Sequence, residues 1–186
     1  MPKAILTATE SLLERVKDLE NRVRLMERLH TPIKIPRGIL DWLSETQPSC
    51  PHYLEVIREC TDHSSLIRTL QRQGVNAATM ALWTKVYVPG SPDCPLRCYD
   101  VSPHNLYAFT GTWTKIGPRE FSAIHRTTEQ WFLKAIKSEF VDGSEGATQL
   151  LQKILHASSD PTKQRARLCT YLRRSLKAVK VYEFEP

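Results

Sequence analysis

The first thirty residues carry a heptad spacing of apolar side chains, which restricts their fold more than any other pattern restricts the rest of the chain. Successive apolar positions alternate between gaps of four and three residues, the spacing that lines the seam of a coiled coil. Valine at the a positions, with mostly leucine at the d positions, favours a parallel dimer. We therefore predict an oligomerisation helix within residues 1–30. Its interface residues are Leu12, Val16, Leu19, Val23 and Met26.

The charges beside this apolar stripe fit the same arrangement. Arg15 and Arg22 fall at g positions, and Glu20 and Glu27 fall at e positions. In a parallel dimer each g residue faces an e residue of the partner, so arginine would meet glutamate at both levels. Further leucines widen the stripe, which leaves a trimer, or a helix packed on its own domain, as alternatives. These leucines are Leu6, Leu13 and Leu29.

Prolines and a glycine separate this helix from the rest of the chain. The residues between His30 and Gly38 predict a linker over 31–38. Hydrophobic residues make up 41% of the chain, which suffices for a compact core. We predict a mainly helical domain with a small β element over 39–157, and a basic C-terminal helix and tail over 158–186. The predicted fold class is mainly α, with the coiled-coil helix at one end and the basic helix at the other.

Apolar periodicity and turn residues place the elements of the central domain. Helical spacing predicts helices near 65–74, 118–140 and 147–157. Residues 75–88 are apolar and remain ambiguous between helix and strand. Residues 106–116 alternate in character around a central glycine, which predicts either a strand pair or one bent strand.

The predicted strand pair carries three aromatic side chains on one side, Tyr107, Phe109 and Trp113. Such side chains can stack on unpaired bases, as they do in RNA-binding sheets. An aromatic strand face more commonly packs in a hydrophobic core, and no RNA-binding sequence signature accompanies this one. We therefore favour a core role for these residues and keep base stacking as the alternative.

Positive charge is concentrated near the C-terminus. Residues 161–180 contain seven lysines and arginines and no acidic residue, whereas the whole chain has a net charge of +6. The remainder of the chain therefore sums to about −1. Asp160 followed by Pro161 predicts a helix start, and apolar residues at helical spacing give this helix an inward side. They are Leu168, Cys169, Leu172, Leu176 and Val179.

When residues are placed about 100° apart around the helix, six cations lie opposite that inward side. Arg165 falls near the edge of the inward side. The six are Lys163, Arg167, Arg173, Arg174, Lys177 and Lys180. Several cations on one rigid surface suit a chain of phosphates, so we expect these residues to bind nucleic acid. A membrane is disfavoured because the apolar side offers no tryptophan or phenylalanine to insert. An acidic protein partner is the competing interpretation.

These features together predict a homo-oligomeric nucleic-acid-binding protein, because oligomerisation would multiply the basic helices and raise avidity. The alternative is an adaptor or scaffold protein that binds other proteins through the coil and the basic helix. The layout is similar to that of virus-encoded nucleic-acid cofactors and of some small transcription regulators. That similarity is one of arrangement and involves no shared motif.

The cysteine count and the N-terminal segment indicate the cellular compartment of the protein. There are five of them, an odd number that cannot pair completely within one chain. The N-terminus meets charged residues too early to supply the apolar region of a signal peptide. We therefore expect reduced thiols in a cytoplasmic or nuclear protein that is not secreted. The five are Cys50, Cys60, Cys94, Cys98 and Cys169.

Cys94, Cys98 and His104 could supply three of the four ligands that zinc requires. Their spacing matches no zinc motif, so we favour free thiols, predict no cofactor and keep zinc as the alternative. The sequence also lacks the signatures of phosphate-binding loops, dinucleotide-binding folds, zinc proteases and serine hydrolases. An enzyme is therefore disfavoured, and no catalytic residue is predicted.

Overall fold

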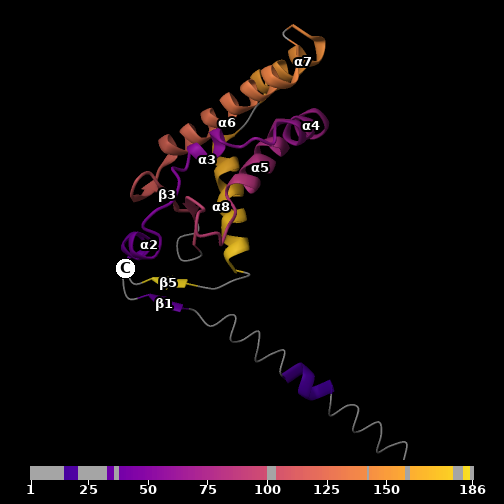
Figure 1. Cartoon of the computed structure of the whole chain (residues 1–186). Helices are drawn as coiled ribbons and strands as arrows, with labels where there is room; N and C mark the ends of the chain where they lie inside the picture. The colour runs from indigo at the N-terminus through magenta and orange to yellow at the C-terminus, as the bar shows by residue number, and fades with distance from the viewer. Residues whose placement is uncertain are drawn as a thin grey trace, which may run out of the picture.

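The computed structural model describes residues 15–20, 33–35, 38–99, 104–141, 143–157, 160–177 and 182–184, without the side chains of 33–35, 174–177 and 182–184. Within these ranges the chain is mainly helical and contains a small three-stranded antiparallel sheet (Figure 1). The prediction of a mainly α fold with a small β element is confirmed. None of the described helices has the length and apolar character needed to cross a membrane.

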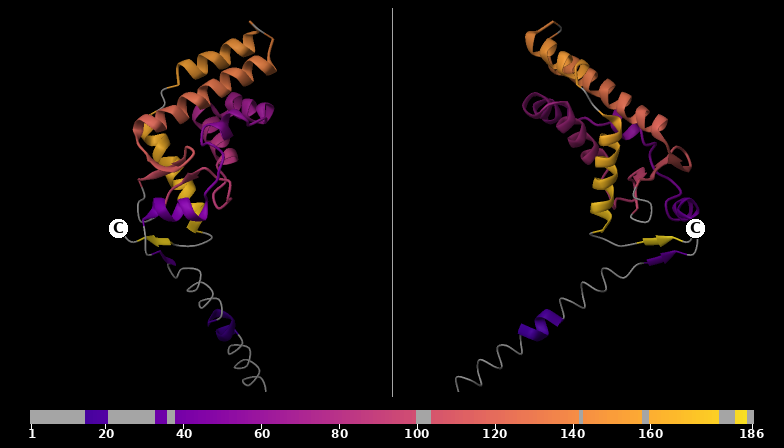
Figure 2. Two further views of the ribbon diagram at one scale, coloured as in Figure 1. Left: turned by 60° about the vertical axis from the view of Figure 1, so that its left-hand side comes forward. Right: turned by 180° about the vertical axis from the view of Figure 1, so that it is seen from behind.

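Residues 15–20 are helical, and all six side chains are exposed. Val16 and Leu19, two of the predicted interface residues, are 52% and 56% exposed. Two views show this helical turn apart from the helices of the body (Figure 2). The other predicted interface residues lie outside the described residues, so the coiled coil stays a prediction. They are Leu12, Val23 and Met26.

A short parallel strand pair joins distant parts of the chain. Strand β1 (Ile33–Ile35) lies within the segment predicted as a linker and pairs with β5 (Tyr182–Phe184). The register places Ile33 opposite Tyr182 and Ile35 opposite Phe184. Three residues are too few to display a strand pattern, and each strand finds its partner near the other end of the sequence. For these reasons the sequence did not indicate the pair.

Helices α3 (Glu55–Arg58), α4 (His63–Gln73) and α5 (Val75–Val86) follow one another in the first half of the body. Gly74, with a φ of 83°, makes the sharp turn between α4 and α5. The segment left ambiguous between helix and strand is therefore helical. Its pattern was ambiguous because α5 is largely enclosed, and only Asn76 and Lys85 are exposed along it.

The antiparallel sheet consists of β2 (Leu96–Arg97), β3 (Leu106–Phe109) and β4 (Trp113–Ile116), with β3 in the centre. Gly111, with a φ of 103°, lies in the turn between β3 and β4, a conformation that glycine adopts without strain. Of the two arrangements predicted around this glycine, the strand pair is the one that forms.

One side of the sheet packs on helix α2 (Ile39–Thr46) through a separate hydrophobic cluster. Tyr107, Phe109 and Trp113 belong to this cluster, and each is less than a tenth exposed. The indole N–H of Trp113 donates a hydrogen bond to the carbonyl of Gln47 at 2.8 Å. The core role predicted for the three aromatic residues is therefore confirmed, and burial leaves no open face on which a base could stack.

Helix α6 (Pro118–Glu139) begins where the Glu120 carboxylate accepts a hydrogen bond from the backbone N–H of Gly117 at 2.8 Å. Helix α7 (Glu145–Leu155) begins at Ser144, whose hydroxyl accepts a backbone N–H of the first turn at 3.3 Å. Helix α7 folds back and lies beside the C-terminal part of α6 (Figure 2, left).

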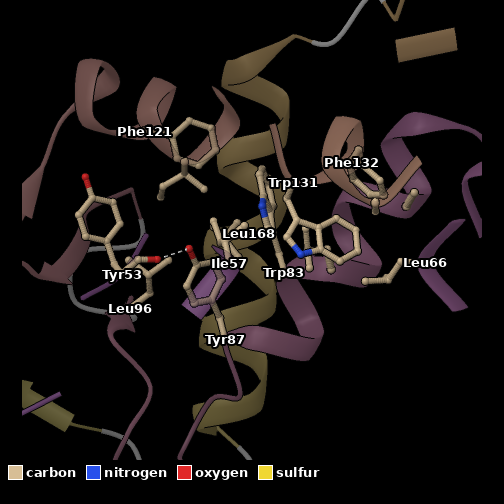
Figure 3. Close-up of a cluster of buried hydrophobic side chains, with 14 of the residues drawn as sticks. Tyr53, Ile57, Leu66, Trp83, Tyr87, Leu96, Phe121, Trp131, Phe132 and Leu168 are labelled. Carbon is tan, nitrogen blue, oxygen red and sulfur yellow. Dashed lines mark hydrogen bonds between the residues drawn. The ribbon is translucent and has the colours of Figure 1, made fainter. Parts of the chain in front are cut away.

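Helix α8 (Pro161–Lys177) runs through the middle of the body, next to α5, α6 and β2 (Figure 1). Three of its predicted inward residues, Leu168, Cys169 and Leu172, are buried in the main hydrophobic core. Leu168 lies close to the large aromatic side chains of that core (Figure 3). Helix α8 is therefore held by the body along its inner side.

Hydrogen bonds fix the buried aromatic residues of this core. The Tyr87 hydroxyl donates to the carbonyl of Tyr53 at 2.7 Å, and this bond is drawn in Figure 3. The indole N–H of Trp83 donates to the Thr128 hydroxyl at 2.9 Å. Each bond satisfies a polar atom that burial removes from water.

Candidate nucleic-acid interface on helix α8

Helix α8 begins with a side-chain cap. The Asp160 carboxylate accepts hydrogen bonds from the backbone N–H of Thr162 at 2.9 Å and of Lys163 at 3.3 Å. The bonds from Lys163 and Thr162 lower the pKa of Asp160, because they favour its charged form. The helix start predicted from Asp160 and Pro161 is therefore built as expected.

Polar side chains tie α8 to helix α5. The Gln164 amide donates to the side-chain oxygen of Asn76 at 2.9 Å, and the Tyr171 hydroxyl donates to the carbonyl of Thr84 at 3.1 Å. These contacts lie about two turns apart along α8. Together with the buried leucines they fix both the rotation and the position of the helix.

Arg165 ties α8 to the sheet. Its Nη2 donates to the carbonyl of Ile116, at the end of β4, at 3.1 Å and to the carbonyl of His104 at 3.4 Å. The side chain is half-buried, so its charge is held at a fixed place beside the helix. It lies near the apolar edge, as its angular position predicted.

The outer side of α8 combines exposed cations with small side chains. Lys163 and Arg167 are exposed, and Ala166 lies exposed between them. Lys163 Nζ lies 3.7 Å from the Asp160 carboxylate, a contact of nearly exposed groups that contributes little. Within the described part of the chain, no hydrogen bond or ion pair engages Arg167. Its guanidinium is therefore available to an anion.

Two hollows flank the small residues of this outer side. The first hollow has a volume of about 210 Å³ and lies on the side of Arg165. The second hollow, of about 410 Å³, lies on the side of Arg167 and Tyr171. Ala166 and Thr170 line both of them. The remaining residues of the first hollow are His104, Thr162, Arg165, Cys169 and Arg173.

Cys169 lines the first hollow, and its thiol is hydrogen-bonded to the thiol of Cys98. The hydrogen bond from Cys98 lowers the pKa of Cys169, and the charges of Arg165 and Arg173 lower it further, although burial acts in the opposite direction. The first hollow is therefore a basic environment that favours negative charge, on a bound group or on the Cys169 sulfur.

The residues predicted to bind nucleic acid are described to different extents. Lys163 and Arg167 lie exposed on the outer side, and Arg173 is half-buried at the first hollow. Arg174 and Lys177 belong to α8, but their side chains lie outside the described part, as does the whole of Lys180. The structure thus places five of the six residues on α8 and describes the side chains of three of them.

The structure does not bring Cys94, Cys98 and His104 together into a metal site. Cys94 donates its thiol hydrogen to the carbonyl of Leu96 at 3.2 Å, and Cys98 contacts Cys169. His104 is exposed at the first hollow. Among the described residues, no group of three or more histidine, cysteine, aspartate or glutamate side chains could hold a metal ion.

Sequence reasoning missed the part that Arg165 plays at this interface. The angular position of Arg165 sets it apart from the basic side, and the sequence gives no sign of the hollow that it lines. Arg165, Cys169 and Arg173 recur at intervals of four residues, so a search for polar residues at helical spacing would have grouped them. The two residues whose carbonyls accept hydrogen bonds from Arg165, His104 and Ile116, come from distant segments that spacing cannot reveal.

Comparison with protein-family models, with curated proteins and with solved structures finds no match to this chain. Any functional conclusion must therefore come from the residues and their geometry.

Proposed function

We propose that the protein is a homo-oligomeric nucleic-acid-binding protein that contacts the phosphate backbone with the outer side of α8. The observation that carries this proposal is the combination of exposed cations and small residues on a helix whose inner side is fixed in the core. Lys163 and Arg167 are exposed on that side, and Ala166 and Thr170 lie between the two hollows.

Charge supports phosphate as the group that is bound. No aspartate or glutamate occurs between 161 and 180, so no carboxylate in that stretch offsets the attraction of its lysines and arginines for an anion. Each phosphate that a lysine or arginine neutralises releases condensed counterions, which favours binding at low salt. Small residues at the centre of the outer side allow the backbone of a nucleic acid to approach until cations on both sides reach phosphates.

Self-association would strengthen this binding. Val16 and Leu19 are more than half exposed in the single chain, and their burial against other copies would remove apolar surface from water. An oligomer presents several copies of α8 to one nucleic acid, and linked contacts raise avidity without any new contact type. The predicted coiled coil of residues 1–30 supplies this association in the proposal.

The test is a titration of the full chain with random single- and double-stranded DNA and RNA at several salt concentrations, read by fluorescence anisotropy. The variant Lys163→Gln with Arg167→Gln removes the two exposed cations and leaves the inner side of α8 unchanged. Binding should weaken similarly for all sequences, and the salt slope should fall by up to about two units, roughly 0.9 for each lost duplex contact.

A charge-matched control removes two exposed lysines of α6, Lys134→Gln with Lys137→Gln. This control should bind nearly as well as the parent. Equal losses in both variants would mean that net charge, not the outer side of α8, governs binding. A parent chain without salt-dependent affinity for any nucleic acid would refute the proposal and would favour an acidic protein as the partner of α8.

A further inference from the structure

We propose that Cys98 and Cys169 form a dithiol site that hydrogen peroxide oxidises to an intramolecular disulfide, which joins the sheet to helix α8. This inference does not depend on nucleic-acid binding.

The two thiols are brought together by the fold. Cys98 directly follows β2, Cys169 lies on the inner side of α8, and α8 packs against β2. Their thiols are in hydrogen-bonding contact, and both residues are buried in the main core. Because the contact joins two fixed elements, the pair is already close before any reaction takes place. A disulfide needs this proximity to form without large backbone movement.

The first hollow gives a small oxidant access to one of the two sulfurs. Cys169 is only 3% exposed, yet it lines this hollow of about 210 Å³. One water molecule takes about 30 Å³ in the liquid, and hydrogen peroxide is larger by a single oxygen atom. Cys98 is fully buried and does not line the hollow. Cys169 is therefore the thiol that meets the oxidant, and Cys98 is the thiol that resolves the product.

The surroundings of Cys169 favour its reactive form. The thiolate is the nucleophile in thiol chemistry. The hydrogen bond from Cys98 and the charges of Arg165 and Arg173 lower the pKa of Cys169. Arg165 is held beside it by the carbonyls of Ile116 and His104. The positive charge therefore stays in place while the sulfur is ionised.

A second pair of cysteines in the same protein lacks these features. Burial is the main cause that raises the pKa of both Cys50 and Cys94, so each remains a thiol at neutral pH. Cys50 donates its hydrogen to the carbonyl of Pro92 at 3.4 Å, and Cys94 donates to that of Leu96 at 3.2 Å. Oxidation should therefore select Cys98 and Cys169.

The reaction proceeds in two balanced steps. The Cys169 thiolate attacks one oxygen of hydrogen peroxide, the O–O bond breaks, and the sulfur becomes a sulfenic acid. The released hydroxide takes up the proton lost by the thiol and leaves as water. The Cys98 sulfur then attacks the sulfenic sulfur, the S–S bond forms, the S–O bond breaks, and a second water leaves. The two sulfurs together lose two electrons, which the peroxide oxygens gain.

The experiment uses the full-length protein. It is reduced, freed of reductant and treated with increasing hydrogen peroxide. The reaction is then quenched in acid, and the remaining thiols, several of which are buried in the fold, are alkylated in denaturant before mass spectrometry. Low peroxide should remove two of the five thiols, make the chain lighter by two hydrogen atoms and yield one cross-linked peptide pair containing Cys98 and Cys169. Dithiothreitol should reverse the change. The melting temperature of the oxidised protein should rise, because the cross-link restricts the unfolded chain.

Three variants separate the parts played by the thiols. Cys169→Ser should leave Cys98 reduced at the same peroxide concentration, whereas Cys98→Ser should stop Cys169 at the sulfenic acid, which dimedone traps. Cys50→Ser is the matched control and should still form the disulfide. A disulfide between Cys50 and Cys94, a disulfide between two chains, or five thiols that survive equally would overturn the proposal. The peptide map of the parent decides this even where a serine variant folds poorly.

Discussion

The helical residues 15–20 and helix α8 are both amphipathic, yet they use their apolar sides in opposite ways. Helix α8 buries Leu168 and Leu172 in the core, whereas Val16 and Leu19 of the first helix are more than half exposed. The spacing of apolar residues thus predicts that a helix has an apolar side, but it does not predict what that side contacts. The contact depends on whether the same chain supplies a complementary surface.

The difference between the two helices also appears in their polar contacts. Gln164, Arg165 and Tyr171 bond α8 to α5, to the sheet and to the residues before it. Within the described part of the chain, no hydrogen bond links residues 15–20 to the body. Polar contacts at the edge of an apolar stripe therefore distinguish α8, which packs on its own chain, from residues 15–20, whose apolar side chains stay exposed.

The largest expected effect is on stability. Leu168→Ala should lower the free energy of unfolding by about 2–5 kcal/mol, because the side chain is fully buried and its truncation leaves a cavity. Leu19→Ala is the matched change on the exposed helix and should alter this free energy by no more than about 0.5 kcal/mol in dilute protein. Urea denaturation followed by tryptophan fluorescence measures both. Similar losses of unfolding free energy in the two variants would contradict the proposed difference between α8 and residues 15–20.

The next effect is on association. If the chain self-associates as proposed, Val16→Glu combined with Leu19→Glu should convert the oligomer into single chains, because charge would replace the apolar seam. The melting temperature of the body should stay unchanged, since these residues do not pack on it. Sedimentation equilibrium and a thermal melt give the two readings.

An unchanged mass in that variant would mean that the first helix is not the interface. A mass that stays constant together with a lower melting temperature would mean that the first helix packs on its own body, as α8 does. Both helices would then pack on the body of their own chain.

The smallest expected effect concerns the cap of α8. The pKa of Asp160 is lowered in the folded protein, so its charge stabilises the fold above its unfolded pKa, and this contribution is lost as the pH falls through the folded pKa. Asp160→Asn keeps an oxygen that accepts the backbone hydrogen bonds but removes the titration. The parent should therefore be slightly more stable than the variant at neutral pH, and the difference should vanish in acid. Melting curves from pH 7 to pH 2 would contradict this if the difference grew with acidity.

The sequence predicted the elements that have clear caps or a clear polar side. Asp160 marked the start of α8, Gly111 marked the turn of the hairpin, and helices close to α4, α6 and α7 followed from apolar spacing. Helix α5 remained ambiguous because it is enclosed on several sides and so lacks a polar stripe. The β1–β5 pair escaped prediction because each strand is short and its partner is distant in sequence.

The candidate interface was predictable only in part. The cations of α8 were visible as a run without acids, because charge and helical angle are properties of one segment. The hollow beside Arg165 and the contact between Cys98 and Cys169 are properties of two segments. Predicting either feature requires knowing which face of the sheet packs against α8. A single sequence does not contain that information in its local patterns.

The β1–β5 pair determines how an assembly of this chain would be laid out. Strand β1 follows residues 1–30 in the sequence, and β5 follows α8. If residues 1–30 form the predicted coil, the pair would hold the end of that coil near the C-terminal end of the basic helix. Around a parallel coil, every copy of α8 would then stand at the same level and at the same distance from the common axis. The cations would form a ring around one end of the coil. The diameter of that ring would set how sharply a nucleic acid must bend to contact every copy of α8.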